Sequence, residues 1–173
     1  MKPIESLKTP RTTIRRLQPA DQKGLTELLC DKSVTQHMAF PDEMLTKEGV
    51  TNLLEMTISA YESERPLLSF AIAENGSGDF IGVTGFSPRE NNEMEVFYAF
   101  LPKYWGKGFA TEILASLTAY ILIETDYGTV VAPITQNNHA SIKVAEKNGF
   151  INCGLREDPN YKDLIFIFKK KKN

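Results

Sequence analysis

Residues 104–112, Tyr-Trp-Gly-Lys-Gly-Phe-Ala-Thr-Glu, are the part of this sequence whose types and spacing point most directly to chemistry. They follow an apolar, strand-like run at 95–101 and lead into an amphipathic, helix-like run at 110–124. The first N–H groups of a helix lack intrahelical partners, and the helix dipole favours negative charge beside them. Gly106 and Gly108 carry no Cβ, so a ligand can approach the backbone closely. The stretch therefore predicts a turn that binds a phosphate or pyrophosphate through main-chain amides.

The spacing within this turn excludes two common phosphate loops. A Walker A loop requires Ser or Thr directly after Gly-Lys, whereas Lys107 is followed by Gly108. A dinucleotide-binding fingerprint requires a third glycine, and this chain has Thr111 at that position. The fingerprint also requires an acid about 20 residues further on, and Glu124 comes too early and lies inside the helical pattern.

A second motif occupies residues 138–150, Asn-His-Ala-Ser-Ile-Lys-Val-Ala-Glu-Lys-Asn-Gly-Phe. Asn138 is suited to an N-cap, and Ser141 then lies one turn inside the helix. Gly149 stands where a helix is expected to stop. One predicted helix and one predicted strand separate this motif from the glycine turn.

Together the two motifs resemble the cofactor segments of the GNAT superfamily of N-acetyltransferases. The family's pyrophosphate loop reads Gln/Arg-x-x-Gly-x-Gly/Ala, which is matched at Trp105, Gly108 and Ala110. Its second segment reads Asn-x-x-Ser-(x)n-Glu-Lys-x-Gly-Phe and is similar to residues 138–150. The Tyr-Trp-Gly-Lys-Gly-(aromatic)-Ala-Thr-Glu version is typical of the RimJ/RimL-like branch, which acetylates protein N-terminal amines among other substrates. Residues 9–17 also fit, so the resemblance covers nearly the whole chain.

The pattern of elements agrees with a mixed α/β (α+β) fold. It predicts helices at 19–30, 46–62, 110–124 and from 138, and strands at 12–17, 68–73, 80–86, 94–101, 129–134, 151–156 and 164–168. The resemblance implies a GNAT-like fold, with a central, mostly antiparallel sheet that is splayed between its two middle strands and flanked by helices. It also implies a single acetyltransferase domain over residues 1–173.

The resemblance implies acetyl-CoA as cosubstrate and supplies candidate binding residues. The pyrophosphate is expected at the amides of Gly106, Lys107, Gly108, Ala110 and Thr111. Phe100 occupies a cofactor-contact position on the strand alongside which the pantetheine arm adds like an extra strand. Trp105 stands where many relatives have Gln or Arg. Asn138 is expected to hold the arm or a bridging water, and Ser141 to contact the reacting sulfur.

Two residues are candidates for catalysis. The resemblance implies that Ser141 donates to the departing thiolate, as in relatives with this Asn-x-x-Ser pattern. Ala145, which replaces the Tyr that many relatives use for this purpose, adds weight to Ser141. Glu95 is the candidate base, acting on the acceptor ammonium through water, with Glu93 as the alternate on the same strand face. Each has a purely structural alternative: Ser141 and Asn138 as helix caps, and Glu95 as a salt-bridged strand residue.

The acceptor amine stays open at this point. The branch favours a peptide or protein N-terminus, whereas a polyamine or aminoglycoside would need several acids in the cleft. Such acids exist in the segments expected on the acceptor side: Asp42, Glu43, Glu90, Glu93, Glu95, Glu157 and Asp158. Tyr98 and Tyr161 are further candidates to line it. A non-catalytic acyl-CoA-binding domain is the alternative from a different functional class.

Bulk composition excludes several other classes. A formal charge of −2 and no basic recognition helix argue against a nucleic-acid binder. Two histidines and two distant cysteines predict neither a metal site nor a disulfide framework. The longest apolar stretch, 113–123, is shorter than the roughly 20 residues that cross a bilayer. No apolar signal region opens the chain, so a cytoplasmic protein with no membrane partner is expected, as a monomer or homodimer. The four lysines at 169–172 are expected to form a frayed, solvated tail.

Overall fold

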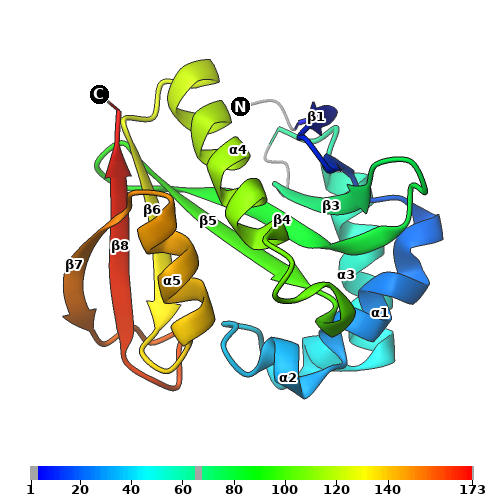
Figure 1. Ribbon diagram of the computed structural model, residues 1–173. Helices are drawn as coiled ribbons and strands as arrows, with labels where there is room; N and C mark the ends of the chain where they lie inside the picture. Colours follow the sequence, from blue (N-terminus) through cyan, green and yellow to red (C-terminus); the bar gives the residue numbers. More distant parts are fainter. Residues whose placement is uncertain (1–3, 65–67, 173) are drawn as a thin grey trace. The chain divides into compact units, whose positions relative to one another are not determined.

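The structure, a computed structural model, describes residues 4–64 and 68–172 (Figure 1). Within them the chain forms a mixed α/β fold with eight strands and five α-helices. The strands are β1 Ser6–Lys8, β2 Thr12–Arg16, β3 Ser69–Glu74, β4 Phe80–Arg89, β5 Glu93–Phe100, β6 Thr129–Thr135, β7 Ile151–Arg156 and β8 Ile165–Lys171. The α-helices are α1 Gln22–Leu29, α2 Lys32–Thr35, α3 Lys47–Ala60, α4 Phe109–Glu124 and α5 His139–Lys147. Three 3-10 turns complete the list: η1 Pro19–Asp21, η2 Asp42–Leu45 and η3 Pro102–Tyr104.

The hydrogen-bonded strand order is β1-β2-β3-β4-β5-β6-β8-β7. Strands β1 to β4 run antiparallel in succession, as do β6, β8 and β7. Strands β5 and β6, by contrast, are parallel. Their register begins at Glu93↔Thr129 and ends at Glu95↔Val131, although both strands continue further. The ladder thus ends before either strand does, which agrees with the expected splay.

The chain divides into two compact units, and β4 and β5 contribute to both. The first unit comprises Met1–Gly85 and Tyr98–Lys107. In it α1 packs against α3, and α3 packs against the preceding turn η2. Its interior contains fully buried apolar side chains from the strands and α1: Ile14, Leu28, Phe70, Ile72 and Ile81.

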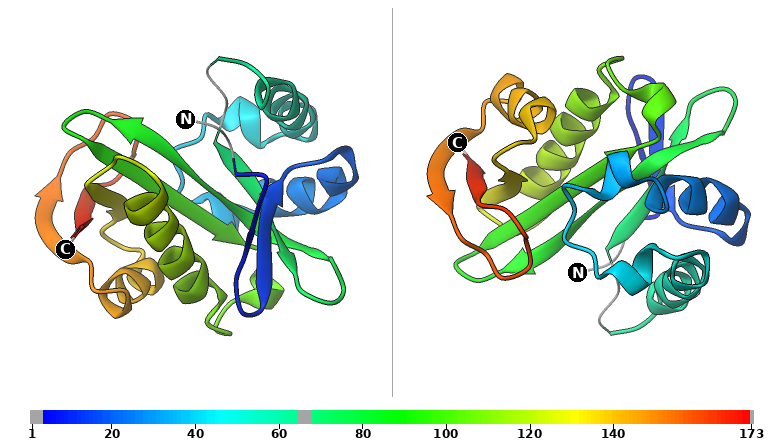
Figure 2. Two further views of the ribbon diagram at one scale, coloured as in Figure 1. Left: turned by 90° about the horizontal axis from the view of Figure 1, so that it is seen from above. Right: turned by 90° about the horizontal axis from the view of Figure 1, so that it is seen from below.

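The second unit comprises Phe86–Phe97 and Gly108–Asn173. Helix α4 presents Ile113, Leu117 and Ile121 at four-residue spacing, and all three side chains are buried. Helices α4 and α5 pack against each other and against β6. Strand β7 lies at the edge beside β8 (Figure 2). Its register with β8 shifts between Asn152 and Leu155, and Gly154 there has a φ of 101°.

Most predicted elements are confirmed, and the differences have physical causes. The short elements β1 and α2 were not predicted, since three or four residues carry too little periodicity. The predicted frayed tail is wrong for Lys169–Lys171, which continue β8 and pair with Val131, Val130 and Thr129 of β6. The single domain over residues 1–173 stays a prediction.

Candidate functional site

The glycine turn has the backbone that the sequence suggested. Gly106 has a φ of 71° and Gly108 a φ of 81°, in the left-handed region that glycine enters without a steric penalty. Gly108 is the N-cap of α4, and no side chain caps that helix. Helices α3 and α5, by contrast, are capped by Thr46 and Asn138. The N-terminus of α4 thus has the backbone and the uncapped end of an anion-binding turn.

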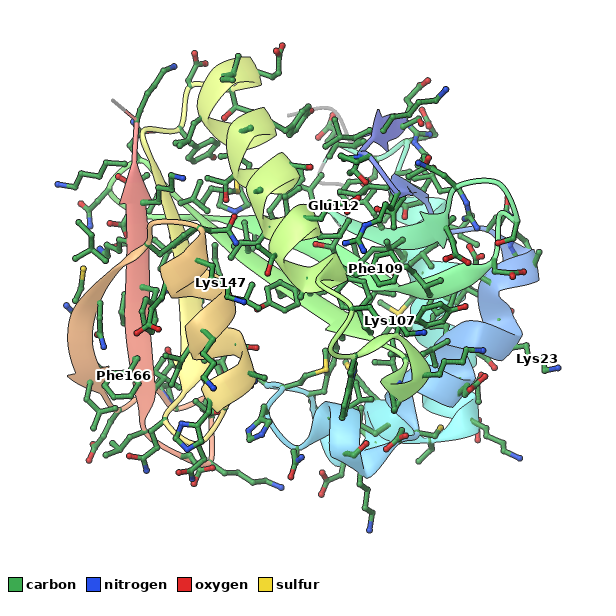
Figure 3. All side chains as sticks on the ribbon, in the orientation of Figure 1. Lys23, Lys107, Phe109, Glu112, Lys147 and Phe166 are labelled. Atoms are coloured by element: carbon green, nitrogen blue, oxygen red, sulfur yellow. The ribbon has the colours of Figure 1, made fainter. Side chains whose placement is uncertain are left out.

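Basic side chains surround the first half of the turn, within the first unit. Arg11 Nη1 donates to the carbonyl of Lys107 at 2.8 Å, which joins the start of the chain to the turn. The Nζ atoms of Lys103 and Lys107 each lie 5.4 Å from the ring centre of Tyr104. Figure 3 shows Lys107 in the turn and Phe109 at the start of α4. The exposed turn therefore carries positive charge suited to phosphates.

Trp105 and Phe100 are held together by a hydrogen bond. The indole Nε1 of Trp105 donates to the Phe100 carbonyl at 2.7 Å. Phe100 is buried, whereas Trp105 is 48% exposed. Trp105 is therefore not a core residue, and its side chain presents a large aromatic surface to solvent beside the glycine turn.

At the second motif, Asn138 caps α5. Its Oδ1 accepts a hydrogen bond from the Ser141 amide at 3.1 Å, so the capping alternative for Asn138 is confirmed. The cap uses the Ser141 backbone and not its hydroxyl. At the other end, Gly149 has a φ of 72° and Phe150 N donates to the Ala145 carbonyl at 3.1 Å, which confirms the predicted helix stop.

Asn148 links the two motifs within the second unit, a role for which local residue spacing carries no signal. Its Nδ2 donates to the Thr111 carbonyl at 3.3 Å, in the first turn of α4, and to the Val144 carbonyl at 2.9 Å. Lys170 Nζ donates to the Asn148 carbonyl at 2.7 Å. Asn148 therefore connects the start of α4 to the end of α5, and Lys170 of β8 binds the same asparagine.

Glu95 is the candidate base, and it lies at the last paired position of the β5–β6 ladder. Its Oε2 is 3.0 Å from Nη1 of Arg89, and the Glu95 side chain is 29% exposed. Burial raises the pKa of Glu95, Arg89 opposes that rise and Asp158 adds to it. The ion pair with Arg89 confirms the alternative that Glu95 is a salt-bridged strand residue. A raised pKa also suits a carboxylate that acts as a base.

Tyr161 belongs to the same group. It packs against the buried cluster of Val131, Ile165 and Ile167. Burial, together with the carboxylates of Glu95 and Asp158, raises the pKa of Tyr161 to about 12. Its hydroxyl therefore stays protonated at ordinary pH, as a potential hydrogen-bond donor beside Glu95.

A pocket of about 600 Å³ opens in the second unit next to this group. Its wall combines apolar and charged residues from the β4–β5 hairpin, from β6 and β8, and from the end of β7 and the segment after it: Pro88, Arg89, Glu90, Asn91, Glu93, Val131, Arg156, Glu157, Asp158, Ile165, Ile167 and Lys169. Lys169 Nζ contacts Glu93 Oε1, so the alternate base Glu93 is held in an ion pair. Of the acids suggested for the acceptor side, Glu90, Glu93, Glu157 and Asp158 meet at this pocket.

The proposed residues divide between the two units. Phe100, Trp105, Gly106 and Lys107 lie in the first, and Glu95, Gly108, Ala110, Thr111, Asn138 and Ser141 lie in the second. Arg89 and Lys169 were missed by sequence reasoning. Arg89 lies between the predicted strands at 80–86 and 94–101, and nothing in that position identifies Glu95 as its partner.

Two further observations concern the residues that the structure describes. No group of three or more His, Cys, Asp or Glu side chains among them is arranged to hold a metal ion. None of their helices combines the length and apolar character needed to span a membrane.

Comparison with known proteins identifies similar sequences. A family model described as an acetyltransferase (GNAT) domain matches residues 11–151. A Bacillus licheniformis protein, the uncharacterized N-acetyltransferase p20, is 26% identical over 160 residues, which are 90% of this chain and 87% of its own. The Bacillus subtilis (strain 168) protein YkkB, itself uncharacterized, is 32% identical over 149 residues, 83% of each chain.

Several solved structures share the fold. A GNAT-family acetyltransferase from Bacillus anthracis has a TM-score of 0.82 at 21% identity, over 96% of this chain and 98% of its own. RimL, the ribosomal L7/L12 alpha-N-protein acetyltransferase in complex with coenzyme A, has a TM-score of 0.77 at 16% identity, with 96% and 98% covered. Spermidine N-acetyltransferase from Vibrio cholerae, in complex with CoA and spermine, has a TM-score of 0.75 at 15% identity, with 93% and 95% covered.

Proposed function

Because the chain belongs to the GNAT family of acetyltransferases, we propose that it transfers an acetyl group from acetyl-CoA to a primary amine. The acceptor nitrogen attacks the thioester carbonyl carbon in a ternary complex, and a C–N bond replaces the C–S bond. An acceptor that arrives as an ammonium ion loses two protons, one to a base before the attack and one after it, and the leaving thiolate takes up one. The protein must therefore hold the thioester, accept one proton and supply another.

The observation that carries this proposal is the backbone of the glycine turn. Gly106 and Gly108 are both in the left-handed conformation, and the turn opens into a helix without a side-chain cap. These features support pyrophosphate binding by the amides of Gly106, Lys107, Gly108, Ala110 and Thr111. Phe100, Trp105 and Asn138 are assigned to the remainder of acetyl-CoA by their match to the family's segments.

We assign the two proton transfers to Glu95 and Ser141. Glu95 accepts the ammonium proton through water, supported by its partial burial and its position at the end of the β5–β6 ladder. Ser141 donates its hydroxyl hydrogen bond to the departing thiolate, since the cap at Asn138 uses only its amide. Ala145 cannot supply the phenol that many family members use at that position.

The acceptor is proposed to be a peptide or protein N-terminal amine. The sequence version of the glycine turn and the fold shared with RimL support that class. A polyamine or aminoglycoside is the second candidate, favoured by the acids that meet at the pocket and by the fold shared with a spermidine acetyltransferase. The alternative from a different functional class is a non-catalytic acyl-CoA-binding domain, which would show no turnover.

Substitution of Gly108 tests the proposal. Gly108→Asp places a carboxylate at the N-terminus of α4, where it repels the phosphates of acetyl-CoA. Affinity measured by calorimetry is expected to fall by roughly 100-fold or more, since unpaired like charges in a binding site cost several kcal/mol.

Gly108→Asn is the matched control, because Asn has the same size, tolerates the left-handed conformation and carries no charge. Its affinity is expected to lie much closer to that of the wild type. Equal affinities for wild type and a folded Gly108→Asp variant would refute binding at this turn.

A further inference from the structure

The hairpin between β4 and β5 brings an arginine onto the candidate base. Strand β4 ends at Arg89 and β5 begins at Glu93. Asn91 and Asn92, between them, have φ values of 60° and 59°. Two successive left-handed residues make a tight reversal, and Asn is among the few residue types that adopt this conformation readily. The reversal returns the chain so that Arg89 Nη1 lies 3.0 Å from Glu95 Oε2.

Charged and titratable groups face Glu95 from each element packed around it. Arg89 comes from β4, while Asp158 and Tyr161 come from the segment between β7 and β8. Glu93, on the same face of β5, is paired with Lys169 of β8. Within residues 4–64 and 68–172, Arg89 is thus the cation that forms an ion pair with Glu95, and Lys169 forms one with Glu93.

Arg89 also forms part of the pocket wall, together with Asp158 and Val131. Val131 is the β6 residue paired with Glu95 in the strand register. One arginine therefore contacts the candidate base and lines the space beside it. An acceptor amine in this pocket would meet the ion pair before or as it gives up its proton.

We propose that Arg89, from the pocket wall, is a positioning residue for the transfer reaction: it orients the neighbouring Glu95 carboxylate and keeps it ionised when the acceptor arrives. This inference rests on the proposed function, in which Glu95 takes the amine proton. Arg89 itself exchanges no proton, because a guanidinium stays charged in proteins. It acts through the carboxylate that it holds.

The electrostatics of the group agree with this role. Burial and Asp158 raise the pKa of Glu95, and Arg89 is the group that counters them. Removing the Arg89 charge raises the pKa of Glu95 further, so the carboxyl group stays protonated over a wider acidic range. A protonated carboxyl group cannot accept the amine proton, and the loss of rate is therefore confined to low pH.

The test compares Arg89→Gln, Arg89→Lys and Arg156→Gln with the wild type. In Arg89→Gln the acidic limb of kcat/KM is expected to move to higher pH, with a loss of roughly two- to five-fold at the acidic end, the range typical of partly exposed ion pairs. Arg89→Lys retains a cation and restores most of the limb. Arg156→Gln removes a different arginine from the same pocket wall and leaves the position of the limb unchanged, whatever its effect on KM.

A second readout needs no acceptor. Titration of the Glu95 carboxyl carbon by NMR is expected to give a higher pKa in Arg89→Gln than in the wild type, and the same value in Arg156→Gln. An unchanged Glu95 pKa, or a loss of rate that is uniform across pH, overturns the inference. An equal shift in Arg156→Gln does so too, since it would reflect the general field of the pocket.

The proposed function fails differently. If Glu95→Gln keeps the wild-type rate and pH profile, the assignment of the base is wrong. If the wild type releases no CoA with any amine, the enzyme proposal is wrong. In either case the NMR titration still decides whether Arg89 controls the ionisation of Glu95.

Discussion

Ser141 combines two roles that use different atoms. Its amide completes the N-terminal cap of α5 at 3.1 Å from Asn138 Oδ1, while its hydroxyl is the proposed donor to the thiolate. Substitution by alanine removes only the hydroxyl, because the backbone amide stays. The two roles can therefore be separated by one mutation.

Ser141→Ala is expected to lower kcat by roughly 10²- to 10⁴-fold, the contribution typical of general acid catalysis, with little change in the Kd of acetyl-CoA. Steady-state kinetics and calorimetry measure the two quantities. Ser116→Ala, which removes a hydroxyl from the body of α4, is the control and should keep wild-type turnover. An unchanged kcat in Ser141→Ala would mean that the Ser141 hydroxyl is not the donor and that water protonates the thiolate.

At this scale the sequence was informative only where residue type and local spacing determine a contact. Asn138 and Gly149 could be placed from their own neighbourhoods, because caps and stops depend on a few adjacent residues. The Arg89–Glu95 pair depends on how two strands meet across a turn, and the Lys169–Glu93 pair joins residues 76 positions apart. Neither contact leaves a trace in local spacing.

Among the elements, α3 and α5 offer a matched pair of helix caps. Thr46 Oγ1 accepts a hydrogen bond from the Gly49 amide at 3.0 Å, and Asn138 Oδ1 accepts one from the Ser141 amide at 3.1 Å. Each satisfies one donor at the start of its helix. Only the α5 cap lies in a proposed cofactor segment.

Thr46→Ala and Asn138→Ala are each expected to lower the free energy of unfolding by about 1 kcal/mol, the typical cost of a lost cap. Urea denaturation measures this loss. Only Asn138→Ala should also weaken acetyl-CoA binding, because Thr46 caps a helix outside both motifs. Equal effects of the two variants on affinity would reduce Asn138 to a purely structural cap.

Long, periodic elements could be predicted and short or composition-driven ones could not. Helix α4 and the hairpin strands β3 to β5 follow from apolar periodicity and strong turn residues. Composition alone predicts that the lysines at 169–172 are solvated. In the structure, however, Lys169 contacts Glu93 and Lys170 contacts the Asn148 carbonyl. Pairing with β6 overrides composition there, since a strand can be completed by residues that its neighbour holds in register.

For the molecule as a whole, a formal charge of −2 gives no strong bias toward a cationic or a neutral acceptor. The local charges at the pocket are mixed as well, with Arg89, Arg156 and Lys169 beside four acids. A polycation would depend on long-range attraction to those acids, which salt screens. A peptide N-terminus carries one reacting amine and depends much less on such attraction.

We therefore expect a Ser- or Ala-initiated peptide to be acetylated in preference to spermidine or an aminoglycoside when they compete at equal concentration. Mass spectrometry identifies the product, and CoA release gives the rate at low and high salt. Acetylation of the polycation alone, with a rate that falls steeply as salt is added, would reverse the assignment of acceptor.

The irregular edge strand β7 has a consequence for how copies of the chain behave beside one another. The backbone N–H and C=O groups on the outer side of an edge strand can pair with another extended chain. The exposed side chains of Ile151 and Leu155 add apolar surface that favours such pairing. The register shift between Asn152 and Leu155, with Gly154 at a φ of 101°, breaks the continuous row that such a partner would need. We therefore expect this bulge to weaken strand pairing between copies of the chain.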